Sequence, residues 1–166
     1  HSPAHSRSSF VPALTNGGFD EALSASPFSW RLRSGPGVLV EVERHSQGDQ
    51  PALHALVSDL NQRVLAEQLL LLPPGRWRLS GRMFVSEGPL QNRYVWRILC
   101  APAQGRPAAE LALGARSART WGQQRLDFVV PATGCGSQWL RLIATAQNQR
   151  SASEVWFDDV ALTTLR

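Results

Sequence analysis

The sequence predicts an all-β protein, a sandwich of two antiparallel sheets. Short runs in which apolar and polar residues alternate are separated by turns containing Gly or Pro, and 166 residues match the size of one domain. With 43% hydrophobic and 18% charged residues, the composition is that of a folded chain. We expect a linker at residues 1–9, where Ser, Pro and His dominate without periodicity, and a single domain over residues 10–166.

The expected strands follow a turn at residues 15–19, where an Asn-Gly step favours positive φ. Residues 37–44 place three valines on one side of the segment and Glu41 and Glu43 on the other, which is the pattern of a strand with one buried face. Residues 76–83 alternate arginine and serine with apolar residues in the same way. Further strands are expected at residues 93–100, 125–130, 138–144 and 155–165.

Residues 52–72 fit two interpretations. Leu53, Leu56, Val57 and Leu60 recur at helical spacing and the segment contains no Gly or Pro, so the local pattern favours an amphipathic helix. The neighbouring β-segments favour two strands joined by a hairpin turn at residues 59–62. Periodicity alone does not decide between the helix and the hairpin.

The basic residues exclude some partners. All 17 are arginine, the formal net charge is +4, and no three arginines are adjacent. Because phosphate recognition needs clustered charge, we expect no nucleic-acid partner. Arginine without lysine, beside abundant Ala and Gly, is typical of a GC-rich bacterial genome. The longest apolar run, residues 69–72, is far shorter than the roughly 20 residues that span a bilayer, so we expect no membrane span.

The two cysteines, Cys100 and Cys135, allow a single intrachain pairing. A disulfide and two free thiols remain equally open, and no CxxC motif or histidine cluster suggests metal or redox chemistry at either. The only methionine is Met83, so we expect the chain to be a domain or processed part of a larger protein. We expect that protein to be exported, to the periplasm, the cell envelope or the medium.

The sequence shows no catalytic motif. The four histidines have no metal-ligand spacing, and there is no GxSxG elbow, P-loop or GxGxxG. Asp158 and Asp159 are adjacent on an expected strand, so their carboxyl groups point to opposite faces and cannot form a glycosidase pair. His54 with Ser58 and Asp59 is a combination that chance supplies in a domain of this size. We therefore expect no enzyme activity.

Several short motifs occur in a familiar order: NGGFD at residues 16–20, Trp30, LLPPGRW at residues 71–77, LDFVVP at residues 126–131 and VWFDDVAL at residues 155–162. This succession resembles the jelly-roll carbohydrate-binding modules, a β-sandwich group within the galactose-binding-domain-like fold, over residues 14–165. The resemblance implies a jelly roll in which the N-terminal turn lies close to the closing strand. It also implies non-catalytic binding of a polysaccharide or oligosaccharide.

Sugar binding relies on aromatic faces that stack on pyranose rings and on planar polar side chains that bond to hydroxyls. We expect the site on a concave face, and its candidate residues are Trp30, Tyr94, Trp96, Trp121, Arg82 and Gln124. Arginines in such a groove would suit acidic polysaccharides. The alternative is that these aromatic residues fill the sandwich and that the domain is a structural or protein-interaction domain without sugar affinity.

The resemblance also implies a structural calcium ion where the N-terminal turn meets the closing strand. Calcium prefers carboxylate and backbone oxygens, and the matching residues are Asp20 and Asp158, with Asp49 as a further oxygen donor. The alternative is that Asp20 and Asp158 are solvated turn residues or form hydrogen bonds with nearby N–H groups. Aspartate stands at position 20, where these modules usually carry glutamate, so the ligand set itself stays open.

Overall fold

The computed structural model describes residues 13–101 and 108–166, which form β-strands and connecting turns without a helix among them. This confirms the all-β prediction; the linker expected at residues 1–9 lies outside the described residues. The ten strands are β1 (Arg31–Leu32), β2 (Val38–Arg44), β3 (Pro51–Val57), β4 (Arg63–Leu70), β5 (Gly75–Glu87), β6 (Gln91–Cys100), β7 (Ala109–Gly114), β8 (Gly122–Val130), β9 (Gln138–Ala144) and β10 (Ser153–Thr164).

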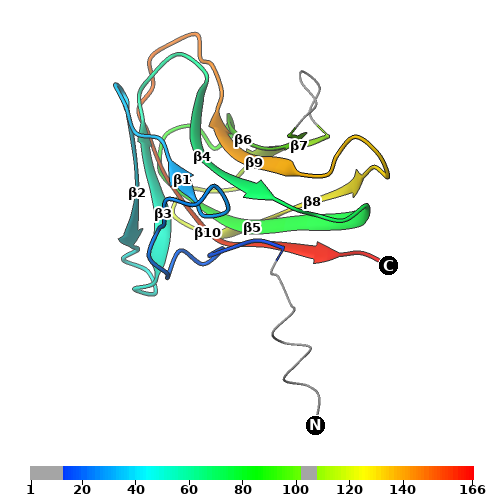
Figure 1. The fold of residues 1–166 in the computed structure, drawn as a ribbon. Coiled ribbons are helices and arrows are strands. Elements are labelled where there is room, and N and C mark those ends of the chain that lie inside the picture. The colour runs from blue at the N-terminus through cyan, green and yellow to red at the C-terminus, as the bar shows by residue number, and fades with distance from the viewer. Residues whose placement is uncertain (1–12, 102–107) are drawn as a thin grey trace.

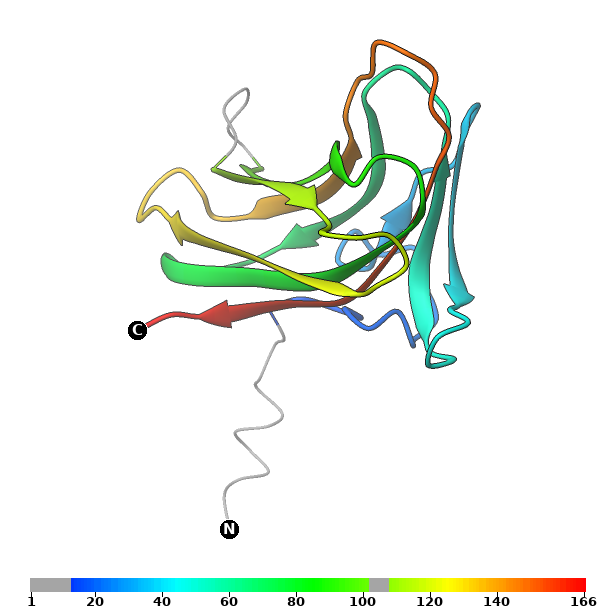
Figure 2. The same ribbon diagram turned by 180° about the vertical axis from the view of Figure 1, so that it is seen from behind.

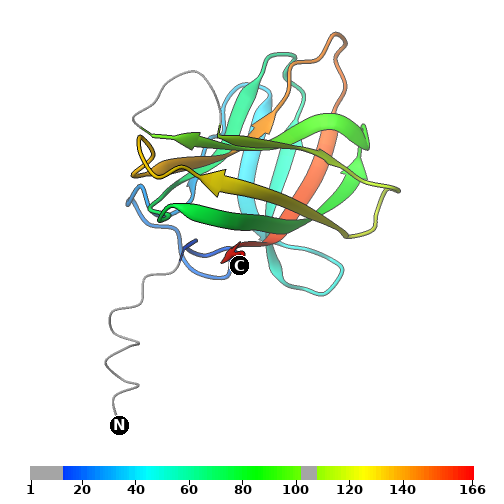
Figure 3. The same cartoon turned by 90° about the vertical axis from the view of Figure 1, so that its right-hand side faces the viewer.

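The strands form two five-stranded antiparallel sheets that pack face to face (Figure 1). Sheet A has the order β1-β4-β9-β6-β7 and sheet B the order β2-β3-β10-β5-β8. Sheet B is strongly bent, since β2 and β3 stand upright whereas β5 and β8 run across the view, and β4 of sheet A curves in the same direction (Figure 1, Figure 3). The face of sheet A that points away from sheet B lies on the inside of this bend and is therefore concave.

Alternation along the strands produces the core, because every second side chain of each sheet points towards the other sheet. Leu53, Leu79, Ile98 and Leu140 are among the fully buried residues, and each contributes about 2 kcal/mol by its removal from water. At one end of the core, the ring of Trp30 lies between those of Phe19, at 5.3 Å, and Trp96, at 6.1 Å.

Residues 52–72 form two strands and not a helix, but these strands do not make a hairpin. β3 belongs to sheet B and β4 to sheet A, so the turn at residues 58–62 carries the chain from one sheet to the other. Asp59 organises this turn by accepting a hydrogen bond from the backbone of Asn61 at 3.1 Å and pairing with Arg63 at 2.6 Å. The hairpin expected at residues 59–62 is thus wrong in its pairing, because both strands need a buried face and each finds it on its own sheet.

The N-terminal turn packs against the closing strand, as the resemblance implied. The backbone N–H of Val160 donates to Gly17 O at 3.0 Å, and a Cβ at position 17 would lie only 1.8 Å from Val160 O. Only glycine permits this close approach. The indole N–H of the buried Trp30 donates to Asn16 O at 2.8 Å and ties the turn to the core.

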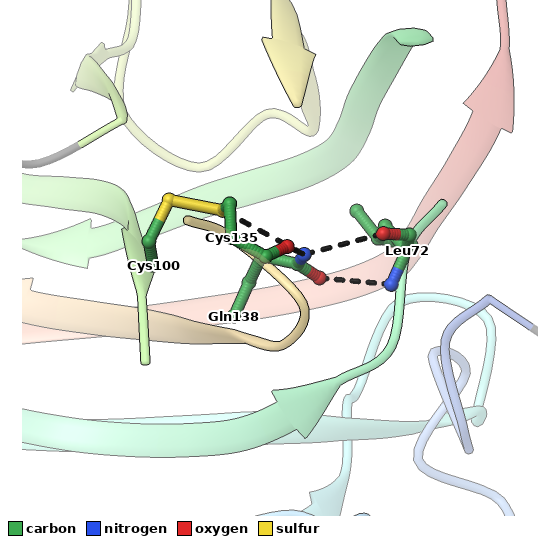
Figure 4. The surroundings of a disulfide bond; sticks show 4 residues. All are labelled: Leu72, Cys100, Cys135 and Gln138. Atoms are coloured by element: carbon green, nitrogen blue, oxygen red, sulfur yellow. Dashed lines mark hydrogen bonds between the residues drawn. A yellow bond between two sulfur atoms is a disulfide. The ribbon is translucent and has the colours of Figure 1, made fainter. Parts of the chain in front are cut away.

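A disulfide joins Cys100, at the end of β6, to Cys135, in the loop before β9 (Figure 4). Beside it, the buried side chain of Gln138 accepts from the backbone N–H of Leu72 and donates to the carbonyls of Leu72 and Cys135. The connections at this end of sheet A are therefore tied together. The edge strands β7 of sheet A and β8 of sheet B run close to each other (Figure 2). The described residues include no helix long and apolar enough to cross a membrane.

Candidate functional site

The concave outer face of sheet A carries a row of charged side chains that crosses all five strands. The strand register pairs Arg31 with Glu67, Glu67 with Arg141, Arg141 with Arg97, and Arg97 with Glu110. Residues that are opposite one another across antiparallel strands share a face, so these five side chains form one continuous row. We call it the charged row.

Glu67, on β4, is the most buried member of the charged row. Its carboxylate is buried and accepts from Arg33 Nε at 2.9 Å and from Arg141 Nε at 2.9 Å. Burial would raise the pKa of Glu67, but the hydrogen bonds and charges of the two arginines outweigh it and hold the pKa below its ordinary value. Glu67 therefore stays ionised and holds two guanidinium groups in place on the surface.

An aromatic and aliphatic row runs beside the charged row. Trp139 on β9 is paired across the sheet with Leu69 on β4 and Leu99 on β6, and all three side chains are partly exposed. The guanidinium carbon of Arg141 lies 5.6 Å from the centre of the Trp139 ring. This face thus combines a partly exposed indole with planar donors, the two devices that sugar binding uses.

Three of the residues expected to bind sugar lie in the core instead. Trp30, Tyr94 and Trp96 are 1–3% exposed, and the Tyr94 hydroxyl is bonded to the Ser153 hydroxyl inside the sandwich. The expectation that Tyr94 and Trp96 lie on the concave face is wrong. Side chains alternate along β6, and these two point into the core. The side chains that β6 presents on the concave face are Arg93, Val95, Arg97 and Leu99.

The other three expected ligand residues lie on or beside sheet B. The guanidinium of Arg82 stacks on Trp121 at 4.6 Å and forms an ion pair with Asp159 at 2.7 Å. Gln124 donates to Gly114 O at 2.6 Å, a bond that links strands β8 and β7 across the edge of the sandwich. Trp121 and Arg82 therefore meet on the outer face of sheet B, while Gln124 closes the edge between the sheets.

The outer face of sheet B also carries a cluster of aromatic side chains. The imidazole of His45 lies 4.3 Å from Phe84, 5.1 Å from Trp121 and 4.6 Å from Trp156, and His54 stacks on Trp156 at 4.0 Å. We call these five residues the aromatic cluster. His45, His54, Phe84 and Trp156 are buried, so the cluster is a second, smaller core on the outside of sheet B.

His54 also contacts acidic residues of the neighbouring strands. Its Nε2 lies 2.6 Å from Glu154 Oε2 on β10, and its Nδ1 lies 3.1 Å from Glu43 Oε2 on β2. A hydrogen bond with Glu43, together with some burial and the charge of Glu43, raises the pKa of Glu41.

Ser58 is not a hydrogen-bond partner of the buried imidazole, so the hydrolase-like arrangement of His54, Ser58 and Asp59 is not formed. Glu41, Glu43 and His54 form instead a group whose ligand atoms could hold a metal ion.

The expected calcium ligands are only partly brought together. Asp158 is buried and accepts from the backbone N–H of Asp159, and burial, with the charges of Asp159 and Asp20, raises the pKa of Asp158 to about 6. Asp20 thus lies near Asp158. Asp49 lies in the β2–β3 loop, where its carboxylate is 3.8 Å from Arg44. The pair of Asp20 and Asp158 fits part of a hard-cation site.

The sequence held a signal for the concave face that residue types alone did not reveal. Trp139 and Arg141 are two residues apart on one strand and therefore share a face, as do Arg97 and Leu99. The sequence pattern did not predict the order of strands that places Glu67 between Arg31 and Arg141. The acidic surroundings of His54 depend in the same way on which strands flank β3.

Comparisons with known proteins concern the fold alone. The sequence matches no protein-family model and no curated protein sequence. The carbohydrate-binding module TmCBM61, solved in complex with β-1,4-galactotriose, has a TM-score of 0.63 at 15% identity, covering 94% of this chain and 100% of that chain. A CBM4 structure has a TM-score of 0.64 at 15% identity, with 92% and 99% covered.

A cyclase from Fischerella sp. TAU, in complex with 4-(1H-indol-3-yl)butan-2-one, is also similar, with a TM-score of 0.60 at 17% identity over 94% of this chain and 98% of that chain. The chain therefore has the jelly-roll fold of carbohydrate-binding modules, and this fold also occurs in an enzyme. Because one fold hosts several functions, the function has to be argued from the faces of this sandwich.

Proposed function

We propose that this chain is a non-catalytic carbohydrate-binding module that binds an acidic polysaccharide on the concave face of sheet A. The observation that carries the proposal is the charged row beside Trp139. A pyranose ring stacked on the indole would place its carboxylate within reach of Arg141 and Arg97. Guanidinium groups bind carboxylates through two parallel hydrogen bonds, which lysine cannot supply.

The arrangement of the row supports binding rather than catalysis. Glu67 is ion-paired with two arginines, and Glu110 is paired with Arg97 at 2.7 Å. The Glu67 carboxylate is a poor proton donor, because its two arginine partners favour the charged form. The face therefore offers stacking and fixed positive charge, and Glu67 is unsuited to protonating a glycosidic oxygen.

The test is calorimetric titration and affinity electrophoresis against polygalacturonate and alginate, with neutral galactan and xylan in parallel. We expect binding of a uronate polymer that weakens with added salt. Trp139→Ala should reduce the affinity at least about tenfold, as removal of a central aromatic contact does. Trp121→Ala is the matched control, since Trp121 is partly exposed on the other sheet.

The outcomes separate the alternatives. If Trp121→Ala abolishes binding and Trp139→Ala does not, the site lies on sheet B around Trp121 and Arg82, as the sequence suggested. If no polymer binds while the chain remains folded, the domain is a structural or protein-interaction sandwich. Trp96→Ala is unsuitable as a test because the ring is buried in the core.

We propose in addition that a calcium ion joins the N-terminal turn to β10 through Asp20 and Asp158. The support is the docking of Gly17 on Val160 beside a buried carboxylate. The ion would neutralise these carboxylates and hold the turn on the strand. Calcium should raise the thermal midpoint relative to chelator, and Asp158→Asn should remove this difference; an equal midpoint with and without calcium would contradict the proposal.

We propose further that the protein is exported, to the periplasm, the cell envelope or the medium, and that this module is one part of a larger bacterial chain. The disulfide of Cys100 and Cys135 supports this, because such bonds persist in oxidising compartments. Fractionation of cells that express the full-length protein, followed by thiol labelling, would test both the location and the oxidation state.

A further inference from the structure

We propose that Glu41, Glu43 and His54, on the outer face of sheet B, form a binding site for a divalent transition-metal ion of the zinc class. The site is separate from the concave sugar face and from the calcium position at Asp20 and Asp158. Glu41 and Glu43 come from β2 and His54 from β3; Glu41 is directly opposite His54 in this antiparallel pair, and Glu43 is opposite Ala52, two residues further along the same face. One ligand atom from each residue lies within 4.8 Å of the other two.

The imidazole of His54 supports the proposal independently of the acidic pair. His54 is 6% exposed, and its Nδ1 is a buried nitrogen without a hydrogen-bond partner of acceptable geometry, although Glu43 Oε2 lies 3.1 Å away. A buried nitrogen left in this state costs free energy. A metal ion between Nδ1 and the carboxylates would satisfy it.

The opposite side of the ring is arranged as in known metal sites. His54 Nε2 lies 2.6 Å from Glu154 Oε2, a contact in which Nε2–H donates to the carboxylate. Such a bond fixes the tautomer, leaves the lone pair on Nδ1 and makes that nitrogen a stronger ligand. Stacking on Trp156 at 4.0 Å fixes the plane of the ring.

The distances are compatible with zinc. Ligands bonded to zinc at about 2.0–2.2 Å with tetrahedral angles lie roughly 3.3 Å apart, close to the present separation of Nδ1 and Glu43 Oε2. The ligand atoms lie within 4.8 Å of one another, so the widest separation would have to shorten by up to about 1.5 Å. Glu41 is only partly buried, so its side chain has room to turn. An imidazole among the ligands favours zinc and its neighbours over calcium, which prefers oxygen alone.

Three protein ligands leave one position of a tetrahedral ion open. That position faces outward, because Glu43 is exposed and Glu41 lies on the surface of the sheet. The open position would take water or an external ligand.

The experiment is calorimetric titration of the full chain, freed of metal by chelator, with zinc chloride. The background variant carries His1→Ser and His5→Ser, since these histidines could bind zinc themselves. We expect one zinc ion per chain and a higher thermal midpoint. Glu41→Gln with Glu43→Gln should weaken binding at least about tenfold, and Glu154→Gln should weaken it within the 10–100-fold range of outer-shell partners.

Glu110→Gln, on sheet A, is the matched control and should bind zinc as the background does. The carboxylate variants are preferred to His54→Gln because His54 also packs on Trp156. Nitrogen NMR of the imidazoles gives a second readout, in which zinc should shift Nδ1 of His54. The proposal is overturned if zinc does not bind in a saturable way, if the double glutamine variant binds zinc as well as the control does, or if His54 Nδ1 does not shift.

Discussion

The outer faces of the two sheets are built from similar alternating strands, yet they differ in whether their aromatic side chains are exposed or buried. On sheet A, the charged row places a buried carboxylate, Glu67, between two arginines and leaves Trp139 partly open beside them. On sheet B, Trp156 and Phe84 are covered by the buried ring of His45. One face keeps Trp139 accessible and arranges charge around it, whereas the other buries Trp156 and Phe84 to extend the core.

The number of tryptophans in the sequence therefore does not indicate which face can bind a ligand. Burial decides which rings can stack on a ligand, and burial follows from strand parity and from what covers the sheet. If this is correct, substitutions on sheet B should act mainly on stability, and substitutions on sheet A mainly on binding.

The largest effect on stability is expected for Trp156→Ala on sheet B. This change removes a buried indole that stacks on His54 and donates to the Ser86 hydroxyl at 3.1 Å, so it should lower the free energy of unfolding by about 4 kcal/mol. Polysaccharide affinity should stay within about twofold when measured on the folded fraction, since the effect is on stability. Urea unfolding and calorimetry would measure the two quantities. Val129→Ala, at a 58% exposed position of the same face, is the control; lost affinity in Trp156→Ala would break the division between the faces.

The second effect concerns the disulfide, which ties two strands of sheet A. The cysteines are 35 residues apart in sequence, and closing a loop of that length stabilises the fold by about 3.8 kcal/mol through the entropy of the unfolded chain. Cys100→Ser with Cys135→Ser should lower the unfolding free energy by this amount. Denaturant unfolding with and without reductant would check it, and the double variant should be insensitive to reductant.

Residue patterns predicted much of this architecture. The alternation in residues 37–44 and 76–83 corresponds to strands β2 and β5, and the NGGFD turn does dock on the closing strand. The helical spacing of residues 52–72 was misleading because β3 and β4 each bury a face against a different sheet. Local periodicity does not contain that long-range information.

The face of each aromatic residue was harder to predict than its strand. Alternation along β6 places Tyr94 and Trp96 on one side of the strand and Arg97 on the other. The sequence of this strand alone did not indicate which of the two sides faces the core. The charged row depends on pairings between strands far apart in sequence, such as Glu67 with Arg141. The contacts of His54 with Glu43 and Glu154 have the same origin.

A smaller effect is expected for Glu67→Gln in the charged row. The change removes charge-assisted hydrogen bonds to Arg33 and Arg141, whose side chains are partly exposed, so the loss of stability should be about 1–2 kcal/mol at pH 7. Loss of this carboxylate should also release Arg141 and change polysaccharide affinity. An unchanged affinity would show that the row does not position the arginines for binding.

The pH dependence gives a sharper test of the same residue. Because the pKa of Glu67 is lowered in the folded state, its contribution is complete above the ordinary value of 4.5 and is lost as the pH falls through the folded-state pKa. The difference in unfolding free energy between the native chain and Glu67→Gln should therefore be constant near neutral pH and shrink below about pH 4.5. Urea titrations at pH 7, 5, 4 and 3 would measure it.

The smallest effect is expected for Arg78→Ala on the outer face of sheet B. Arg78 binds Asp127 through two hydrogen bonds, at 2.7 and 3.1 Å, a geometry as good as that around Glu67. Both side chains are, however, exposed, so water competes for each group and the lost pair should leave the denaturation midpoint unchanged within error. Asp127→Asn should behave in the same way. A clear loss of stability in either variant would mean that the geometry of an ion pair, and not its burial, sets its contribution, and the charged row of sheet A would then not differ from the surface pairs of sheet B.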